Sequence, residues 1–463
     1  MSKDRVSRSG VSRREFLALA AMTPLLPALS RADMGAVEKN PDVVIVGAGA
    51  AGIAAAHVLR KAGVSFALVE AGSRVGGRAW TDTDTFGVPF DRGAHWVSVP
   101  EQSPSRNPYY ARAREGDYRF YRAEDNYRIF KPEREATADE VDELWQAYAD
   151  IERRIGRAAE RSRDVSPASV VSNEGDWAHT AGFVMGPWSM AKDLDGFSCL
   201  DWWNSEGQTD WFCAQGYGTL VADYLGDIPV MLDTAVSRIH WGGSGVKVDT
   251  NRGSIRARAV IVTVSTGVLA SEGISFEPAL SADKTESFHK ISMGHYNHIA
   301  LKFSEDIFDM GENGYLLHQV DDSKEAIGTL TNASGTGLAY CDVGGSFAQE
   351  LEKAGAEEAI DFALEKLRGV IGSDVDRHFS KGAVTGWGGD AHFRGSYASA
   401  EPGAYPLRRE LRQQVGDRIY FAGEACHETL WATVSGANSS GTEIARAVVS
   451  EIRNDGRGIT GLP

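Results

Sequence analysis

The fold of this chain is decided by the stretch DVVIVGAGAAGIAAAHVLRKAGVSFALVEAGSRVGGRAW, residues 42–80. Its first apolar run, Val43–Val46, is typical of a strand that is buried on both faces of a parallel sheet. An alanine-rich helix follows and ends at Gly63, and a second apolar run leads to Glu70. This order of strand, helix and strand predicts a Rossmann-like α/β domain.

Three glycines lie where the first strand meets the helix. Gly47, Gly49 and Gly52 have the spacing G-x-G-x-x-G. Gly47 is expected to allow a tight turn, Gly49 to let the backbone approach a pyrophosphate, and Gly52 to let helix and strand pack closely. The start of the helix would face the phosphates, and Glu70 would bind ribose hydroxyls. The spacing predicts a dinucleotide site but leaves NAD and FAD open.

The residues that follow carry a resemblance to a known family. Glu70–Arg78 reads E-x-x-x-R-x-G-G-R, Phe90–Val97 reads FDRGAHWV, and residues 418–452 read RIYFAGEACHETLWATVSGANSSGTEIARAVVSEI. These segments resemble the FAD-dependent amine oxidases, a family that includes monoamine oxidases, polyamine oxidases and flavin-dependent histone demethylases. The resemblance extends from residue 42 to 452. It implies an FAD-binding α/β domain and an interleaved substrate-binding domain of mixed sheet and helices.

The resemblance also implies which residues bind FAD. Arg78 would bind a phosphate, Val236 would contact adenine, and Glu424 would contact the ribityl or phosphate region. The cofactor-binding set that it implies is Gly47, Gly49, Ala51, Gly52, Glu70, Gly77, Arg78, Ala94, His95, Trp96, Val236, Trp387, Gly423, Glu424, Thr433 and Val434. Ser396 lies where covalent members carry a cysteine, and a hydroxyl is a weaker nucleophile than a thiolate. The FAD is therefore expected to be non-covalent.

The same resemblance suggests a discontinuous domain organisation. The FAD-binding domain would comprise residues 40–135, 211–295 and 386–455, and the substrate-binding domain residues 136–210 and 296–385. Residues 1–36 would be a signal and linker, and 456–463 a tail. Ser12-Arg13-Arg14 precedes a short apolar run, 17–29, which cannot span a bilayer. This start resembles a twin-arginine signal and predicts a periplasmic protein without stable membrane anchoring.

The residues at the flavin face depart from the family in two places. Tyr397 matches one wall of the aromatic cage that holds the amine, but Leu430 and Thr433 replace the other wall, and Trp431 is the alternative aromatic face. In HYNHIALKF, residues 295–303, IALKF alternates as a half-buried strand does. Aligning it places His298 where the family has a lysine that holds a water beside flavin N5.

Two readings of His298 remain open. As a flavin-proximal group it would hold that water and be cationic only in part near neutral pH, so that the reaction with O₂ would be slowed. Otherwise it is a local structural histidine. His95 is a second candidate for handling a proton or a water. The catalytic candidates are thus His298, Tyr397, Trp431 and His95.

The composition of the chain limits the kinds of partner and ligand that it is expected to bind. The net charge of −16 argues against nucleic acid, because phosphate needs a basic face. Residues 183–212 are dense in tryptophan and carboxylates, which would suit an organic cation, although a tryptophan-rich core under an acidic surface is the favoured reading. The four cysteines show no metal-ligand spacing, and no metal site is predicted; they are expected to be free thiols, with one disulfide left open.

The predicted function is that of a secreted flavoprotein amine oxidase. A hydride would pass from the α-carbon of a small amine to flavin N5, and the imine would hydrolyse to a carbonyl and an amine. O₂ would accept the electrons and give H₂O₂, or a periplasmic carrier would take them. The alternatives are an L-amino-acid oxidase, for which Arg394 is the candidate carboxylate ligand, a carotenoid-type desaturase or isomerase, and a flavin-binding protein without activity. A homodimer is left open.

Overall fold

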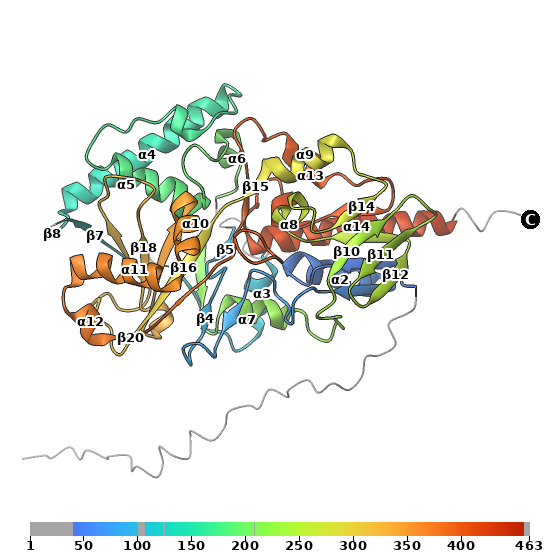
Figure 1. Ribbon diagram of the computed structural model, residues 1–463, viewed down its shortest axis with the longest axis horizontal. Coiled ribbons are helices and arrows are strands. Elements are labelled where there is room, and N and C mark those ends of the chain that lie inside the picture. The colour runs from blue at the N-terminus through green and yellow to red at the C-terminus, as the bar shows by residue number, and fades with distance from the viewer. Residues whose placement is uncertain (1–39, 101–106, 124–125, 133, 208, 458–463) are drawn as a thin grey trace, which may run out of the picture. The chain divides into compact units, whose positions relative to one another are not determined.

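The glycine-rich segment folds as the sequence predicts. The computed structural model describes residues 40–457, except 101–106, 124–125, 133 and 208 (Figure 1). The strand β1 (Val43–Val46), the helix α2 (Ala50–Ala62) and the strand β2 (Phe66–Val69) follow one another. Gly63 ends α2 in the left-handed conformation, with φ 70°. The predicted signal and linker, 1–36, and positions 458–463 of the tail lie outside the described residues.

A parallel sheet forms around β1 and confirms the α/β fold class. Its strand order is β2-β1-β13-β22, with β13 at Ala259–Val262 and β22 at Ile419–Phe421. Every pair in it is parallel. The sheet therefore joins segments from the beginning, the middle and the end of the chain.

The two faces of this sheet are covered by different layers. On one face, Val43 and Ile45 pack in a cluster with α2 and with α14 (Val434–Arg457). A Cβ on Gly441 would lie 2.1 Å from the carbonyl oxygen of Ala51, so α14 lies in direct contact with α2. On the other face, Val44 packs in a cluster with a second sheet. That sheet has the order β12-β11-β10-β14, with β10 (Val236–His240), β11 (Val246–Thr250), β12 (Gly253–Ala257) and β14 (Ser275–Glu277).

A larger sheet carries His298. Its order is β20-β16-β19-β18-β17-β7-β8. The strands are β7 (Tyr127–Lys131), β8 (Arg134–Glu135), β16 (Tyr296–Phe303), β17 (Gly314–His318), β18 (Gly328–Thr331), β19 (Leu338–Gly344) and β20 (Phe379–Val384). Strands β7 and β8 join it although the sequence assigned residues 40–135 to the FAD-binding domain. The sheet thus extends beyond that boundary, and the division into two domains stays a prediction.

The expectation of a half-buried strand at IALKF was wrong. All but one of the residues of β16 are buried. Ile299 and Leu301 pack with the helices α10 (Gly345–Ala354) and α11 (Ala356–Ile371), which lie beside β16 in Figure 1. Ala300 faces the other way, into a cluster that contains Trp188 and Tyr340. Because both faces are covered, the alternation in the sequence does not mark a solvent face.

The remaining elements surround these sheets. The helix α4 (Ala138–Glu160) begins with a capping box of Thr137 and Glu140, which the sequence pattern Thr-x-x-Glu at residues 137–140 predicts. The others are β3 (Thr81–Asp82), β4 (Phe90–Asp91), β5 (Val97–Val99), α3 (Pro108–Glu115), β6 (Phe120–Arg122), η2 (Pro167–Ser169), α5 (Ala178–Phe183), the π-helix η3 (Val184–Trp188), α6 (Cys199–Trp203), β9 (Thr209–Cys213), α7 (Tyr217–Tyr224), α8 (Thr266–Ala270), α9 (Ala282–Lys290), β15 (Ile291–Met293), η4 (Ala333–Gly335), α12 (Asp374–His378), β21 (Ala398–Ala400), α13 (Leu407–Arg412) and η5 (Glu424–Cys426).

All four cysteines are buried free thiols, so the disulfide that the sequence left open does not form in this structure. Within residues 40–457, apart from the gaps, no helix combines the length and the apolar character needed to cross a bilayer.

Candidate active site

One cavity of about 970 Å³ connects the glycine turn with the large sheet. It is lined by every predicted site residue except Gly52. Gly52 lies behind the lining, where a Cβ would be 1.9 Å from the carbonyl oxygen of Gly47. The structure thus brings the predicted cofactor and catalytic residues together, although they come from segments far apart in the sequence.

The glycine end of the cavity fits a dinucleotide. Gly47 has φ 104°, which favours glycine. The helix α2 has no side-chain N-cap and no acidic residue in its first turn, so its first N–H groups are open to an anion. The Glu70 carboxylate is held in the lining by N–H bonds from Ala48 and Gly72, both 2.8 Å. These groups suit the pyrophosphate and the ribose of FAD.

Arg78 ties the first half of the site to the last. Its Nη1 donates to Glu424 Oε1 at 3.0 Å and to the Ser396 carbonyl at 2.6 Å. Glu424 Oε2 in turn accepts from the backbone N–H groups of Ala432 at 3.0 Å and of Ala398 at 3.3 Å. The ion pair therefore fixes two C-terminal loops against the glycine-rich segment. The binding of a phosphate by Arg78 stays a prediction.

A left-handed residue shapes the wall beside this pair. Ala432 has φ 62°, which costs a residue with a Cβ about 1–2 kcal/mol. The backbone N–H of Ala432 donates to Glu424, so the Glu424 side of the ion pair stabilises this left-handed conformation. The turn leads from Trp431 to Thr433 and Val434, where α14 begins, and all three residues line the cavity.

His298 lies in the cavity wall with both ring nitrogens bonded to the protein. Nδ1 is 2.5 Å from Asp342 Oδ1, and Nε2 is 3.0 Å from the Gly93 carbonyl oxygen. The side chain is 2% exposed. Burial is the largest single effect and lowers the pKa of His298. Asp342, the Gly93 carbonyl and Asp91 raise that pKa, and their combined effect outweighs burial, so the pKa lies above its usual value. The predicted water on a ring nitrogen is therefore not compatible with this geometry.

His95 is the neutral counterpart of His298. The two rings lie edge to face, with their centroids 4.9 Å apart. Burial lowers the pKa of His95 well below its usual value, and the neighbouring His298 lowers it further. The Nε2 atom of His95 is buried and has no hydrogen-bond partner among the described residues.

Aromatic side chains line the rest of the cavity. Tyr397 donates its hydroxyl to the Ser189 carbonyl at 3.2 Å, and its ring lies 6.0 Å from that of Tyr296. Trp431 lines the cavity with a buried indole nitrogen that has no partner in the described chain. The wall is completed by Trp96, Tyr127, Trp145, Tyr148, Trp188, Trp202 and Tyr315. Part of the tryptophan-rich segment thus faces the cavity rather than a closed core.

Two carboxylates face the same space. Glu206 and Asp210 line the cavity, and Asp210 accepts a hydrogen bond from Ser98 at 3.1 Å. Burial raises the pKa of Asp210. The arginines among the described lining residues are Arg78 and Arg394, and both come from segments that the sequence assigned to FAD. No other arginine of the described chain lines the cavity, although Arg408 lies behind the Trp431 ring.

Comparison with known proteins then decides the family. The sequence profile described as "Flavin containing amine oxidoreductase" matches residues 50–449. The chain belongs to this family. It is an FAD-dependent amine oxidoreductase, as the resemblance over residues 42–452 implied.

Named relatives agree with this assignment. The chain is 28% identical to polyamine oxidase 3 of Oryza sativa subsp. japonica, over 87% of its own length and 88% of the relative's. It is also 28% identical to lysine-specific histone demethylase 1 homolog 1 of the same plant, but it spans only 53% of that protein. Cyclohexylamine oxidase from Brevibacterium oxydans shares the fold, with a TM-score of 0.75 and 21% identity over 89% of this chain and 100% of that one.

A further solved structure shows the same fold. Putrescine oxidase bound to putrescine has a TM-score of 0.74 and 21% identity, and the match covers 89% of this chain and 99% of that one. At this identity the match supports the fold. The site itself is argued from the residues of this chain.

Asp342 is a residue of the site that the sequence analysis did not identify. It is the single charged residue in the apolar strand LAYCDVG, residues 338–344. An aspartate in the middle of such a run is a signal, because a buried carboxylate needs a partner. Its partner could not be named without the pairing of β16 with β19.

Proposed function

We propose that the chain oxidises a small aliphatic amine by hydride transfer from its α-carbon. The observation that carries this proposal is the single cavity, which joins the dinucleotide cradle to the aromatic wall. FAD supplies the hydride acceptor when it is bound. The side chains of the wall would hold the neutral amine and shield it from bulk water, because hydride transfer needs a fixed and close approach.

The residues around the acceptor position have separate roles in this proposal. Tyr397 and Trp431 frame the amine. The pair of Arg78 and Glu424 holds the loops that carry them. Ser396, whose hydroxyl donates to the Gly294 carbonyl at 2.9 Å, supports a non-covalent FAD. Water then hydrolyses the imine to a carbonyl compound and an amine.

The carboxylates favour a substrate with a second positive charge. Glu206 and Asp210 line the cavity together with aromatic faces, a combination that stabilises ammonium groups. Polyamine oxidase and putrescine oxidase, by their names, act on such amines. An amino acid would need a cation for its carboxylate instead. We therefore infer a diamine or polyamine rather than an amino acid.

Asp210→Asn is expected to weaken the use of diamines selectively. Losing one charged hydrogen bond costs about 1.5–3 kcal/mol, so KM for a diamine should rise by about 10- to 150-fold. KM for the monoamine of the same chain length should change less than threefold. Steady-state kinetics with matched amine pairs measures both. Equal effects on both amines would contradict a second-ammonium site, and Glu206→Gln shows whether the other carboxylate takes that role.

The proposal includes the location of the protein in the cell and its electron acceptor. The Ser12-Arg13-Arg14 segment and the apolar run after it support export by the twin-arginine route to the periplasm. That route carries folded proteins, which suits a chain that binds FAD first. O₂, giving H₂O₂, or a periplasmic electron carrier would reoxidise the enzyme there.

Anaerobic mixing tests the proposed function directly. The yellow protein is mixed with monoamines, diamines and amino acids, its absorbance is followed, and air is then admitted. Bleaching by amines, with diamines the fastest, is the expected result, and recovery of colour with formation of H₂O₂ identifies O₂ as acceptor. Bleaching by amino acids alone would overturn the proposal in favour of an amino-acid oxidase. No bleaching by any compound would favour a flavin-binding protein without activity.

A further inference from the structure

His298 lies between two oxygen acceptors. Its Nδ1 faces the Asp342 carboxylate at 2.5 Å, and its Nε2 faces the Gly93 carbonyl at 3.0 Å. A neutral imidazole has one N–H and can satisfy only one of them, whereas an imidazolium has two. Since the ring is 2% exposed, solvent does not supply the missing donor. When Asp342 is ionised, both contacts are complete only if His298 carries both protons.

Asp342 is built into the sheet as the partner of this ring. The strands β16 and β19 pair so that His298 lies directly opposite Asp342. The carboxylate is completely buried, and its second oxygen accepts from the Trp188 indole N–H at 3.4 Å. A buried ionised carboxylate needs a charged partner, and His298 is the ionisable base in contact with it.

We propose that Asp342 is a positioning residue that keeps His298 protonated, so that the cavity wall carries a fixed positive charge beside Gly93. His298 then acts as a cation whose two N–H groups donate to Asp342 and Gly93, and not as a base. A fixed cation stabilises negative charge that develops in the cavity during amine oxidation and reoxidation. The sequence led us to expect a His298 that is only partly protonated near neutral pH, whereas this proposal gives His298 a full positive charge.

The other groups that face His298 are compatible with a cation. Thr385 Oγ1 accepts its backbone N–H at 2.8 Å, and the rings of Tyr340 and Tyr296 lie 5.1 and 5.7 Å away. His95, with its lowered pKa, is neutral beside it. Asp91 adds a second acidic group, although burial raises its pKa to about 6 despite hydrogen bonds from Thr81 and two backbone N–H groups.

The protonation state can be measured without turnover. In flavin-loaded protein labelled with ¹⁵N-histidine, the ring of His298, assigned by His298→Gln, is expected to show two protonated nitrogens from pH 6 to above the usual histidine range. In Asp342→Asn the ring should become neutral, with its pKa lower by about one to three pH units. A singly protonated His298 in the native protein at pH 7, or an imidazolium that persists in Asp342→Asn, would overturn the proposal.

The kinetic consequence rests on the proposed function and is measured separately. Asp342→Asn should slow reoxidation or flavin reduction by at least about tenfold and shift its pH profile. It should add nothing to His298→Gln, because it acts through that ring. Asp249→Asn is the matched control, since Asp249 holds a partly exposed histidine, His240, at 2.8 Å outside the cavity. If Asp342→Asn shifted the pH profile equally in the His298→Gln background, the positioning role would be refuted. If no amine bleaches the flavin, the labelling experiment still decides the charge.

The pH dependence of the free energy of unfolding tests the charge of His298 independently of activity. The pKa of His298 is raised in the folded state, so the pair stabilises the fold below the usual histidine range and loses this contribution as pH rises through the folded pKa. Asp342→Asn should therefore destabilise the protein most in mildly acidic buffer and less in alkaline buffer. Urea unfolding at several pH values measures the difference, and a loss that grew with pH would contradict the charge assignment.

Discussion

Asp201→Asn is expected to lower the free energy of unfolding by about 3–5 kcal/mol, because it leaves a buried guanidinium without its counter-charge. Asp201 and Arg408 are 0% and 2% exposed. Their side chains make two hydrogen bonds, from Arg408 Nε to Oδ1 at 2.9 Å and from Nη2 to Oδ2 at 2.5 Å. Urea unfolding of the flavin-loaded protein measures the loss.

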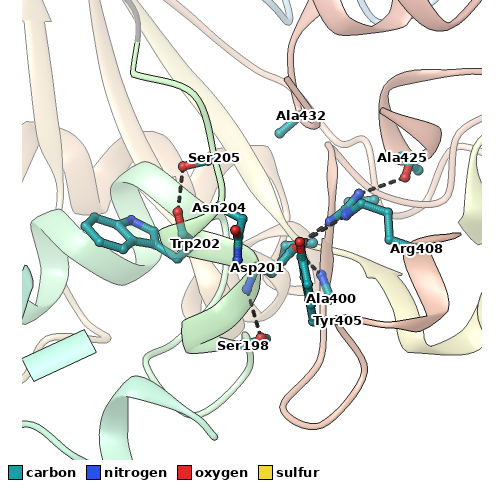
Figure 2. Close-up of polar contacts among 12 residues, drawn as sticks. Ser198, Asp201, Trp202, Asn204, Ser205, Ala400, Tyr405, Arg408, Ala425 and Ala432 are labelled. Atoms are coloured by element: carbon teal, nitrogen blue, oxygen red, sulfur yellow. Dashed lines mark hydrogen bonds and ion pairs between the residues drawn. The ribbon is translucent and has the colours of Figure 1, made fainter. Parts of the chain in front are cut away.

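The pair of Asp201 and Arg408 also joins several segments of the chain. Its removal should therefore disturb the wall of the cavity. Figure 2 shows Asp201 on α6 between Ser198, Ala400 and Arg408. Asp201 Oδ2 accepts the Ala400 N–H at 2.7 Å, and Arg408 Nη1 donates to the Ala425 carbonyl at 2.7 Å. The guanidinium carbon lies 5.1 Å from the centre of the Trp431 ring, which lines the cavity. KM for the amine should therefore rise in the same variant.

Two controls separate charge burial from other effects. Asp376→Asn removes the carboxylate that binds Arg368 Nε at 2.9 and 3.1 Å, but in an exposed pair, and should cost at most about 1 kcal/mol. The double change Asp201→Leu with Arg408→Met removes both buried charges and should recover part of the stability, because the Ala400 N–H and the Ala425 carbonyl still lose their partners. A loss of less than about 1 kcal/mol in Asp201→Asn would show that the buried pair does not stabilise the fold.

The sequence predicts well what depends on neighbouring residues. The strand–helix–strand unit, the capping box at Thr137 and the turn at Gly63 each follow from local patterns, and all three are present. The family resemblance then predicted residues that line one cavity, because a motif fixes the position of each residue in a fold that is already known. Local rules and resemblance together thus gave the α/β class and most of the cavity wall.

The charged pairs depend on contacts that no local pattern carries. Asp201 and Arg408 are 207 residues apart, and His298 and Asp342 are 44 apart. Their pairing follows from helix packing and from strand register, and a shift of one residue in β19 would turn Asp342 to the opposite face. The burial of β16 was also missed, because alternation in a sequence does not tell whether a second layer covers the outer face.

Gly52→Ala is expected to weaken FAD binding strongly. The added Cβ would lie 1.9 Å from the Gly47 carbonyl oxygen and 3.4 Å from Ile45. Since the first contact is with backbone, α2 must move away from β1, and the phosphate-facing turn at Gly47 moves with it. Overpacking of this kind costs about 1–3 kcal/mol, and we expect FAD affinity to fall by about 5- to 150-fold. Flavin content after purification and a titration of the apoprotein with FAD measure this.

Gly369→Ala makes the same chemical change in a helix where nothing opposes it. Gly369 lies in α11, is exposed, and a Cβ there would meet no atom within 4 Å. Alanine favours a helix over glycine by about 1 kcal/mol, so this variant should be slightly more stable and should bind FAD normally. Gly52 gains the same helix preference, so the difference between the two variants isolates the contact with Gly47. If both variants bound FAD equally well, the close packing of α2 on β1 would not be what requires glycine at position 52.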